Sequence, residues 1–327
     1  MLHATFQGTA KPSFFDQFIT YAFYPLLLAI TLLLYFSALH QGWNLAGVFL
    51  CMAGGRLLLL LAVEYWRPAK AQWKMTWASF QRDLKYMLTN GGVSGLMKVG
   101  LTWLALDWSR VNTGIVSNTS IAFEFLAIVL VFEFFQYWYH RLSHEGPGRW
   151  GAWLWNVHVA HHLPDRVYLL MHPVGHPLNA LISMALVQLP LVTLGARAES
   201  IFLFNALMGL QGLISHFNVD IKAGCLNYLL VGTELHRFHH SANIAEAKNF
   251  GALTPFWDIV FGTFVYQPGR LPEALGVVNP ALYPQSTQLG KVLLLPFRRA
   301  MHSNISRGEQ TLGKAHAAQA SERTRST

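Results

Sequence analysis

Long apolar runs separated by short polar stretches dominate the first half of the chain. An α-helix needs roughly 20 residues to cross ~30 Å of hydrocarbon. Four runs approach that length, at residues 18–39, 45–63, 91–108 and 121–139. The third is the weakest, because Lys98 and several glycines interrupt it. The pattern therefore predicts four membrane-spanning helices.

Two further apolar runs, residues 178–194 and 201–215, are joined by the short polar tip GARAES. They predict a helical hairpin that either spans the membrane or enters and leaves it on one side. The N-terminus shows no basic start followed by an apolar core and a small-residue cleavage site, so the first run is expected to remain as a span. A chain that is 53% hydrophobic agrees with membrane residence.

The basic residues indicate which side of the membrane each loop faces. Formal net charge is +8, and the stretch between the second and third runs is rich in basic residues. In residues 41–44 and 109–120, by contrast, Arg110 is the single basic residue. That stretch contains Arg67, Lys70, Lys74, Arg82 and Lys85. Basic loops stay in the cytoplasm, so this stretch and the N-terminus are predicted to be cytoplasmic, at the inner membrane if the source is bacterial. A membrane role accounts for the charge better than a nucleic-acid partner does.

Histidine is concentrated in one part of the chain. Eleven of the fifteen histidines lie between residues 140 and 240, and eight of these form three groups with helical spacing. The groups are His140 and His144; His158, His161 and His162; and His236, His239 and His240. Residues at i, i+3 and i+4 share a helical face, so each group presents its imidazoles together. The predicted topology places all three groups on the cytoplasmic face.

Eight imidazoles exceed what one metal ion binds. Zinc takes three or four protein ligands, and neutral imidazole also suits iron, copper and nickel, so the groups predict two ions. His216 is a candidate ninth ligand or a residue that supports one. Cys51 and Cys225 stand in no paired motif, which argues against a disulfide framework, a zinc finger and an iron–sulfur cluster.

The remaining histidines and the neighbouring aromatic residues are weaker candidates. His172 and His176 are expected at most to support the ligands. The isolated histidines are expected to be ordinary interfacial residues; they are His3, His40, His302 and His316. The side chains expected to ring the site are Trp150, Trp153, Trp155 and Phe238. Arg237 and Phe238 are expected only to shape their helix and its membrane contact.

Two polar residues precede the first histidine group on the same helical stripe. Glu133, Gln136, His140 and His144 are three, four and four residues apart. Metal-bound imidazoles usually donate their other N–H to a carboxylate or amide, and an ionisable residue in a span is a functional candidate. Glu133 or Gln136 is therefore predicted to orient His140 or a neighbouring ligand. A polar contact between spans is the alternative.

The segment GPGRWG, residues 146–151, fits the G-x-G-x-x-G pattern of dinucleotide sites. It follows a membrane helix rather than a buried strand, and no βαβ unit surrounds it. We interpret it as a turn that lets His144 and His158 face each other. No nicotinamide or flavin site is visible, so electrons are expected from outside the chain.

Five segments occur in a fixed order: YHRLSH (139–144), LWNVHVAHH (154–162), ELHRFHHS (234–241), NFG (249–251) and WDIVFGT (257–263). Together they resemble the fatty acid hydroxylase superfamily, which includes the sterol desaturases and alkylglycerol monooxygenase. The resemblance extends over residues 64–263. It departs from the family pattern at LPDR, residues 163–166, a difference that concerns the identity of the substrate.

The resemblance implies a membrane-bound di-iron, O2-dependent oxidoreductase that hydroxylates or desaturates an unactivated C–H bond of a lipid. It implies that the eight grouped histidines ligate iron, with His216 as the family's isolated histidine before an Asn. It also implies an external NAD(P)H-linked electron donor of the cytochrome b5, ferredoxin or reductase type. A metal transporter or sensor would instead place ligands near the bilayer midplane. A zinc-dependent hydrolase would be expected to carry a motif such as HExxH, which does not occur.

The chain is expected to divide into three parts. Residues 1–120 hold the first spans and the basic loop, residues 121–283 hold the catalytic region, and residues 284–327 form a flexible basic tail with an amphipathic stretch at 292–301. The predicted fold class is all-α: an integral membrane helical bundle of four spans plus a helical hairpin, capped by a cytosolic histidine-rich helical domain.

Overall fold

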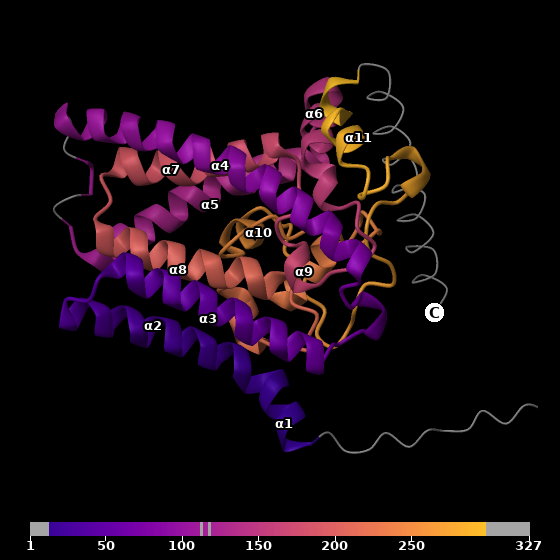
Figure 1. Ribbon diagram of the computed structural model, residues 1–327, viewed down its shortest axis with the longest axis horizontal. Helices are drawn as coiled ribbons and strands as arrows, with labels where there is room; N and C mark the ends of the chain where they lie inside the picture. Colours follow the sequence, from indigo (N-terminus) through magenta and orange to yellow (C-terminus); the bar gives the residue numbers. More distant parts are fainter. Residues whose placement is uncertain (1–12, 112–113, 117–118, 299–327) are drawn as a thin grey trace, which may run out of the picture.

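The computed structural model describes residues 13–111, 114–116 and 119–298 of the chain. These residues form helices and connecting segments with no β-strand among them, which confirms the predicted all-α class. Figure 1 shows long helices lying side by side, with shorter helices and loops gathered at one end. The histidine-rich segments belong to that end.

Among the residues that the structure describes, five helical segments are long and apolar enough to cross a membrane, so the chain is a multi-pass membrane protein. The first, Phe14–Gln41, joins α1 (Phe14–Gln17), a π-helical turn (Phe18–Ala22) and α2 (Phe23–Gln41). The others are α3 (Leu45–Trp66), α5 (Ile121–Glu145), α7 (Pro177–Leu194) and α8 (Ala198–Ser215). The predicted hairpin is thus α7 and α8, each 18 residues long. At 1.5 Å per residue each is about 27 Å long, the length of a full crossing.

Helix α4 (Trp77–Val111) differs most from the prediction. It begins inside the stretch expected to be a polar loop and runs unbroken through the glycines of the third predicted span. A glycine costs a helix only about 1 kcal/mol relative to alanine. The packing of α4 along α7 offsets that cost (Figure 1). The predicted span is therefore one part of a 35-residue helix.

The α2–α3 and α7–α8 turns lie at the end of the bundle away from the short helices α6 (Gly148–His158) and α9 (Thr233–His239) (Figure 1). The α7–α8 turn contains Gly195, whose φ is 67°, and packs against Gly114. A Cβ on Gly195 would lie 2.4 Å from the Gly114 Cα, so only glycine fits there. Next to it, Arg197 pairs with the buried Glu124 of α5 at 2.7 Å. These contacts fix α5 and the hairpin to each other.

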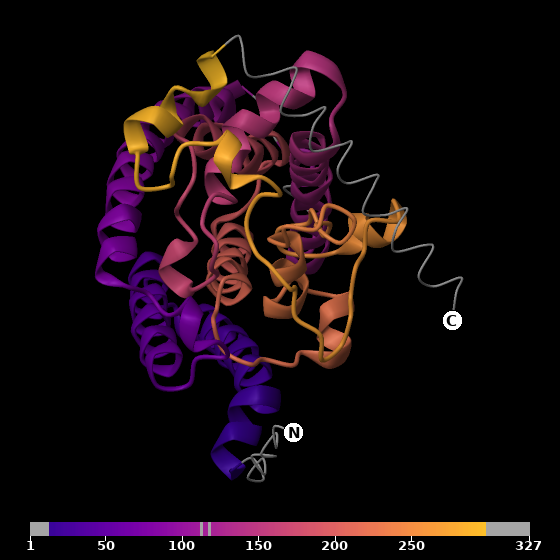
Figure 2. The same cartoon turned by 90° about the vertical axis from the view of Figure 1, so that its right-hand side faces the viewer.

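The opposite end is built from short helices: α6 (Gly148–His158), α9 (Thr233–His239), α10 (Phe256–Val260) and α11 (Leu289–Leu293). The 3-10 turns between them and the spans are Ala71–Trp73, Val159–His161, Leu169–Met171, Gly224–Tyr228, Pro280–Leu282 and Leu295–Phe297. Figure 2 looks onto this end and shows the C-terminal segments, orange to yellow, folded across it. They cover the ends of the long helices where the histidines lie.

Helix α10 does not stay at the end of the bundle. It packs against α5, and Trp257 Nε1 donates a hydrogen bond to the Leu130 carbonyl in the middle of α5 at 3.3 Å. Leu253, just before α10, packs in one core cluster with Phe132 of α5 and Phe204 of α8. The segment 249–263 thus packs against α5, and its residue Leu253 reaches the core that α5 and α8 share.

The first part of the predicted tail packs against the bundle. Val292 and Leu295 are buried, Tyr86 donates to the Ser286 carbonyl at 3.0 Å, and His176 Nε2 lies 3.1 Å from the Leu293 carbonyl oxygen. The packed region therefore extends to Pro296. The rest of the predicted amphipathic stretch, like residues 299–327 as a whole, lies outside the described residues.

Candidate metal centre

Nine histidines gather at one end of the bundle in two groups. Within each group, one ring nitrogen per residue lies within 4.8 Å of all the others. The first group contains His140, His144, His158, His162 and His239, and the second contains His161, His216, His236 and His240. The groups adjoin, because the rings of His162 and His240 are 4.6 Å apart. His216, which the sequence left as either a ninth ligand or a residue that supports one, belongs to the second group.

The sequence motifs divide between the two groups by a simple rule. His158 and His162 lie in the first group while His161 lies in the second, and His236 and His240 lie in the second while His239 lies in the first. In an α-helix such as α9, residues i and i+4 differ in direction by about 40°, whereas i+3 points about 100° away from i+4. His161 and His162 follow α6 in a 3-10 turn, and the same division is observed there. Each i, i+4 pair therefore faces one group, and the intervening histidine faces the other.

The ring nitrogens within each group approach as neighbouring ligands of one ion do. His158 Nε2 lies 3.1 Å from His140 Nε2 and 3.0 Å from His162 Nε2, and His216 Nε2 lies 3.1 Å from His236 Nε2. Two nitrogens that each lie about 2.1 Å from an ion are at most about 4.2 Å apart. Two ring nitrogens of the first group are buried without a hydrogen-bond partner among the described residues: His144 Nε2 and His239 Nε2. Buried polar atoms normally have partners, so these fit open metal-binding positions.

Main-chain carbonyls orient several rings from behind. His140 Nδ1 donates to Phe250 O at 2.8 Å, His239 Nδ1 donates to Lys248 O at 3.0 Å, and His161 Nδ1 donates to Val174 O at 2.8 Å. A carbonyl only accepts, so Nδ1 carries the proton and the Nε2 lone pair faces the group. This is the arrangement expected of histidine ligands.

Asn179 of α7 also supports the centre and was not predicted. Its Oδ1 accepts a hydrogen bond from Tyr139 Oη at 2.7 Å and lies 3.1 Å from His158 Nδ1. Its signal in the sequence is an isolated amide in the first turn of an otherwise apolar run, a position where polar residues bind neighbouring helices.

Burial keeps the ring nitrogens neutral. It lowers the pKa of His161 to about 4. Burial, followed by neighbouring imidazoles, holds the pKa of other ring groups well below the ordinary histidine value; these are His158, His162, His216, His236, His239 and His240. A neutral imidazole is the form that binds a metal ion, so the site is prepared for metal at neutral pH.

Glu133 or Gln136 was predicted to orient His140 or a neighbouring ligand, most simply by direct contact with its ring. Neither side chain makes such a contact in the structure. Glu133 is fully buried and accepts hydrogen bonds from the main-chain N–H groups of residues 252–254. Gln136 Oε1 is buried without a partner among the described residues. Helical spacing placed both on the correct stripe, but the segment 249–263 comes between Glu133 and the ligands.

The two weaker histidine candidates have different surroundings. His172 Nδ1 lies 3.3 Å from His216 Nδ1, so it adjoins a member of the second group. His176 caps α7: its Nδ1 accepts from the Leu178 N–H at 3.0 Å. His176 therefore has a structural role at the start of the helix that carries Asn179.

The prediction that Arg237 and Phe238 only shape a membrane contact is wrong. Both are about 1% exposed, and Arg237 donates to the carbonyls of Phe217 and Val219 at 2.8 and 2.7 Å. They point into the protein because α9 is enclosed by the segments after α8 rather than lying on the surface. Of the predicted aromatic ring, Trp155 contacts His144, whereas Trp150 is 80% exposed.

The turn at residues 146–151 brings His144 and His158 together, with ring centroids 5.1 Å apart. Gly146 and Gly151 touch in this turn, and a Cβ on Gly151 would lie 1.8 Å from the Gly146 carbonyl oxygen. Gly151→Ala must therefore push α5 and α6 apart. We expect at least about 1–3 kcal/mol of destabilisation and a loss of metal, measured by thermal unfolding and metal analysis.

Gly290→Ala is the matched control for this turn. Gly290 lies in α11, and nothing stands within 4 Å of a Cβ added there. It should leave both measurements unchanged. Normal metal content in Gly151→Ala would contradict the role given to the turn.

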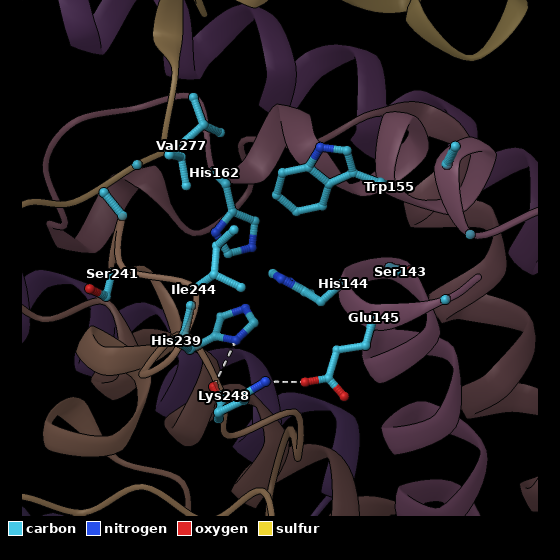
Figure 3. A pocket seen from close by; sticks show the side chains of 17 residues that line it. Ser143, His144, Glu145, Trp155, His162, His239, Ser241, Ile244, Lys248 and Val277 are labelled. Atoms are coloured by element: carbon cyan, nitrogen blue, oxygen red, sulfur yellow. Dashed lines mark hydrogen bonds and ion pairs between the residues drawn. The ribbon is translucent and has the colours of Figure 1, made fainter. Parts of the chain in front are cut away.

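A pocket of ≈ 90 Å³ opens beside the first group. Figure 3 shows His144, His162 and His239 facing one another at its base, with the paired side chains of Lys248 and Glu145 beside them. A water molecule occupies about 30 Å³ in the liquid, so the pocket has room for small molecules such as O2 or water. It gives the first group access from outside the protein.

Comparisons with known proteins agree with this site. The fatty acid hydroxylase family model matches residues 125–263, which contain all nine grouped histidines. The chain is 28% identical to the ornithine lipid hydroxylase OlsE of Rhizobium tropici over 257 residues, which cover 76% of this chain and 75% of that protein.

Two more distant relatives match shorter regions. The fatty acid hydroxylase vlmA of a Lecanicillium species is 28% identical over 41% of this chain and 40% of its own length. The very-long-chain aldehyde decarbonylase GL1-10 of Oryza sativa subsp. japonica is 26% identical over 47% of this chain and 50% of its own length. No solved structure matches significantly. The region that holds the nine grouped histidines is therefore similar to the fatty acid hydroxylase family, and most of the chain is similar to a lipid hydroxylase.

Proposed function

We propose that the protein is a membrane-bound di-iron, O2-dependent hydroxylase of a lipid. The observation that carries the proposal is the pair of adjoining all-histidine groups, each with neutral rings whose lone pairs converge. Two iron ions, when bound, would supply the activation of O2 and the oxidation of an unactivated C–H bond. The family and its lipid hydroxylase relatives support this class of reaction.

The protein's own residues have three roles in this proposal. The nine histidines hold the ions, and the carbonyls of Phe250, Lys248 and Val174 fix the direction of three of the rings. Trp155 packs against His144 and narrows the pocket, which limits the water that reaches the first group. The spans bring the site to lipid, and the pocket admits small molecules from outside.

We propose a polar membrane lipid of the ornithine lipid type as the substrate, because the relative that covers most of the chain is named for that activity. Electrons would come from an external NAD(P)H-linked partner of the cytochrome b5, ferredoxin or reductase type. The cytoplasmic orientation rests on the basic residues near the histidine end, and it would expose the pocket to such a donor.

The test is lipid mass spectrometry of cells that carry or lack the intact gene, grown with air. We expect a lipid in the first culture that is heavier by one oxygen atom. Growth in ¹⁸O2 should add two further mass units to that lipid. A lipid lighter by two hydrogens would identify a desaturase instead. Identical lipids in both cultures would count against an oxygenase of either kind.

A further inference from the structure

Two buried glutamates from membrane spans hold main-chain segments that carry or orient the ligands. Glu133 of α5 is 0% exposed, and Glu64 near the end of α3 is 7% exposed. Each accepts hydrogen bonds from main-chain N–H groups of later segments. The two glutamates contact different segments, and these lead to different histidine groups.

The first network supports the segment 249–263, which packs against α5. Glu133 accepts from the N–H groups of residues 252–254, those of Ala252 and Thr254 at 3.1 Å. Asp258 accepts from the N–H groups of Phe250 and Gly251 at 2.8 Å each. Two carboxylates thus satisfy five consecutive amides. Irregular backbone beside membrane spans needs such partners, because an unsatisfied amide there costs several kcal/mol, on the order of a lost hydrogen bond or more.

This segment bears directly on the first group. The Phe250 carbonyl accepts the Nδ1–H of His140, and the Lys248 carbonyl accepts that of His239. Both His140 and His239 belong to the five-histidine group. Glu133 therefore acts on the first group through the backbone.

The second network has the same construction around Glu64. Its carboxylate accepts from the Leu169 N–H at 2.9 and 3.2 Å and from the Asn218 N–H at 2.8 Å. Leu169 begins the short segment that ends at Val174, whose carbonyl accepts the Nδ1–H of His161. Asn218 lies two residues after His216.

Arg237 completes this second support. Its guanidinium donates to the carbonyls of Phe217 and Val219, on either side of the residue that Glu64 holds. Both His161 and His216 belong to the four-histidine group. The backbone on which the second group depends is therefore tied to a glutamate of α3.

We propose that Glu133 and Glu64 are positioning residues, each serving one of the two metal subsites: Glu133 the five-histidine subsite and Glu64 the four-histidine subsite. The inference rests on the proposed two-metal function. Its consequence is that the subsites can be weakened separately, even though their histidines alternate along the same short helices.

The experiment uses Glu133→Gln and Glu64→Gln in the full-length protein, purified in detergent and loaded with ⁵⁷Fe. Glutamine keeps the shape but replaces one accepting oxygen with an NH2 donor that faces an N–H group. Iron per chain and the Mössbauer spectrum are measured. His144→Ala and His236→Ala identify which iron signal belongs to which subsite. Loss of support behind a ligand typically costs about 10–100-fold in metal affinity.

We expect each glutamine variant to hold about one iron under loading that fills both sites of the wild type. Glu133→Gln should lose the signal that His144→Ala loses, and Glu64→Gln the signal that His236→Ala loses. Glu124→Gln is the matched control: Glu124 is equally buried on α5, but it binds Arg197 at the far end of the bundle. This control should retain both irons.

Retention of both irons, equal loss of both, or loss of the opposite signal in the glutamine variants would overturn the inference. A wild-type protein that binds fewer than two irons would instead overturn the proposed function. If a glutamine variant does not fold, Asp258→Asn replaces Glu133→Gln and Arg237→Lys replaces Glu64→Gln, with the same expected signals. Amide hydrogen exchange gives an independent measurement. Faster exchange should be confined to residues 250–254 in the variant that replaces Glu133→Gln or in Glu133→Gln itself, and to residues 169–174 and 217–219 in the corresponding Glu64 variant. An exchange rate that rises evenly along the chain would contradict the assignment.

Discussion

Replacing His239 with alanine is expected to abolish lipid hydroxylation and to reduce metal content from about two ions per chain to about one. His239 Nδ1 donates to the Lys248 carbonyl, and its buried Nε2 has no other partner among the described residues. Its remaining lone pair therefore faces the first group. Removing a residue behind a ligand typically costs about 10–100-fold, so removing a ligand should cost more than about 100-fold in activity. Metal analysis and lipid mass spectrometry measure the two effects.

The control for this substitution is His40→Ala. His40 lies in the last turn of α2, next to the turn at Gly42 and away from the histidine end. It should leave metal content and hydroxylated lipid at wild-type levels. A His239→Ala protein with two ions and normal lipid products would remove His239 from the site.

Removal of the metal is expected to eliminate hydroxylation completely, and Fe²⁺ is expected to restore it where Zn²⁺ does not. Zn²⁺ fits imidazole ligands but has no redox chemistry, so it should occupy the site without turnover. Without an ion, the converging ring nitrogens of nine histidines lose their partners in a buried site. An ion present at about 100 times its dissociation constant stabilises the folded state by about 2.7 kcal/mol. The metal-free protein should therefore also unfold at a lower temperature.

The measurements are lipid product formation and thermal unfolding of the purified protein before and after chelation, and again after each ion is added. Raised unfolding temperature with either ion, but product only with Fe²⁺, is the expected combination. Cleavage of a lipid by water with Zn²⁺, in place of hydroxylation, would favour a zinc-dependent membrane hydrolase. No change in product after complete chelation would exclude a role for metal.

Much of the candidate site is predictable from sequence because the spacing of residues along a helix determines the direction in which their side chains point. The pairs His140 and His144, and His236 and His240, are four residues apart, and in the structure each pair lies in one group. The membrane spans are predictable in the same way, since an apolar run of the necessary length usually forms a membrane-spanning helix. Helix α4 was predicted only in part: its polar first turns, residues 77–90, were expected to be a loop, and its glycines weakened the predicted span at 91–108. The structure has one helix there, which packs along α7.

The division of the nine histidines into a group of five and a group of four is visible only in the tertiary structure. His161 and His239 each lie within a motif whose other members face the opposite group, and only the positions of α6, α8 and α9 around them show where each ring ends. The assignment of Arg237 to the interior also depended on those neighbours.

By itself, the sequence determined the all-helical membrane class and the eight grouped histidines, because both depend on the period of the helix. The tertiary structure alone decided which histidines gather in one group, that His216 joins the second group, and how Glu133 and Glu64 are connected to the grouped histidines. The connections from these glutamates run through main-chain N–H and carbonyl groups, which almost every residue carries. No residue type marks a chosen carbonyl such as that of Phe250, so only the path of the folded backbone shows which one meets His140.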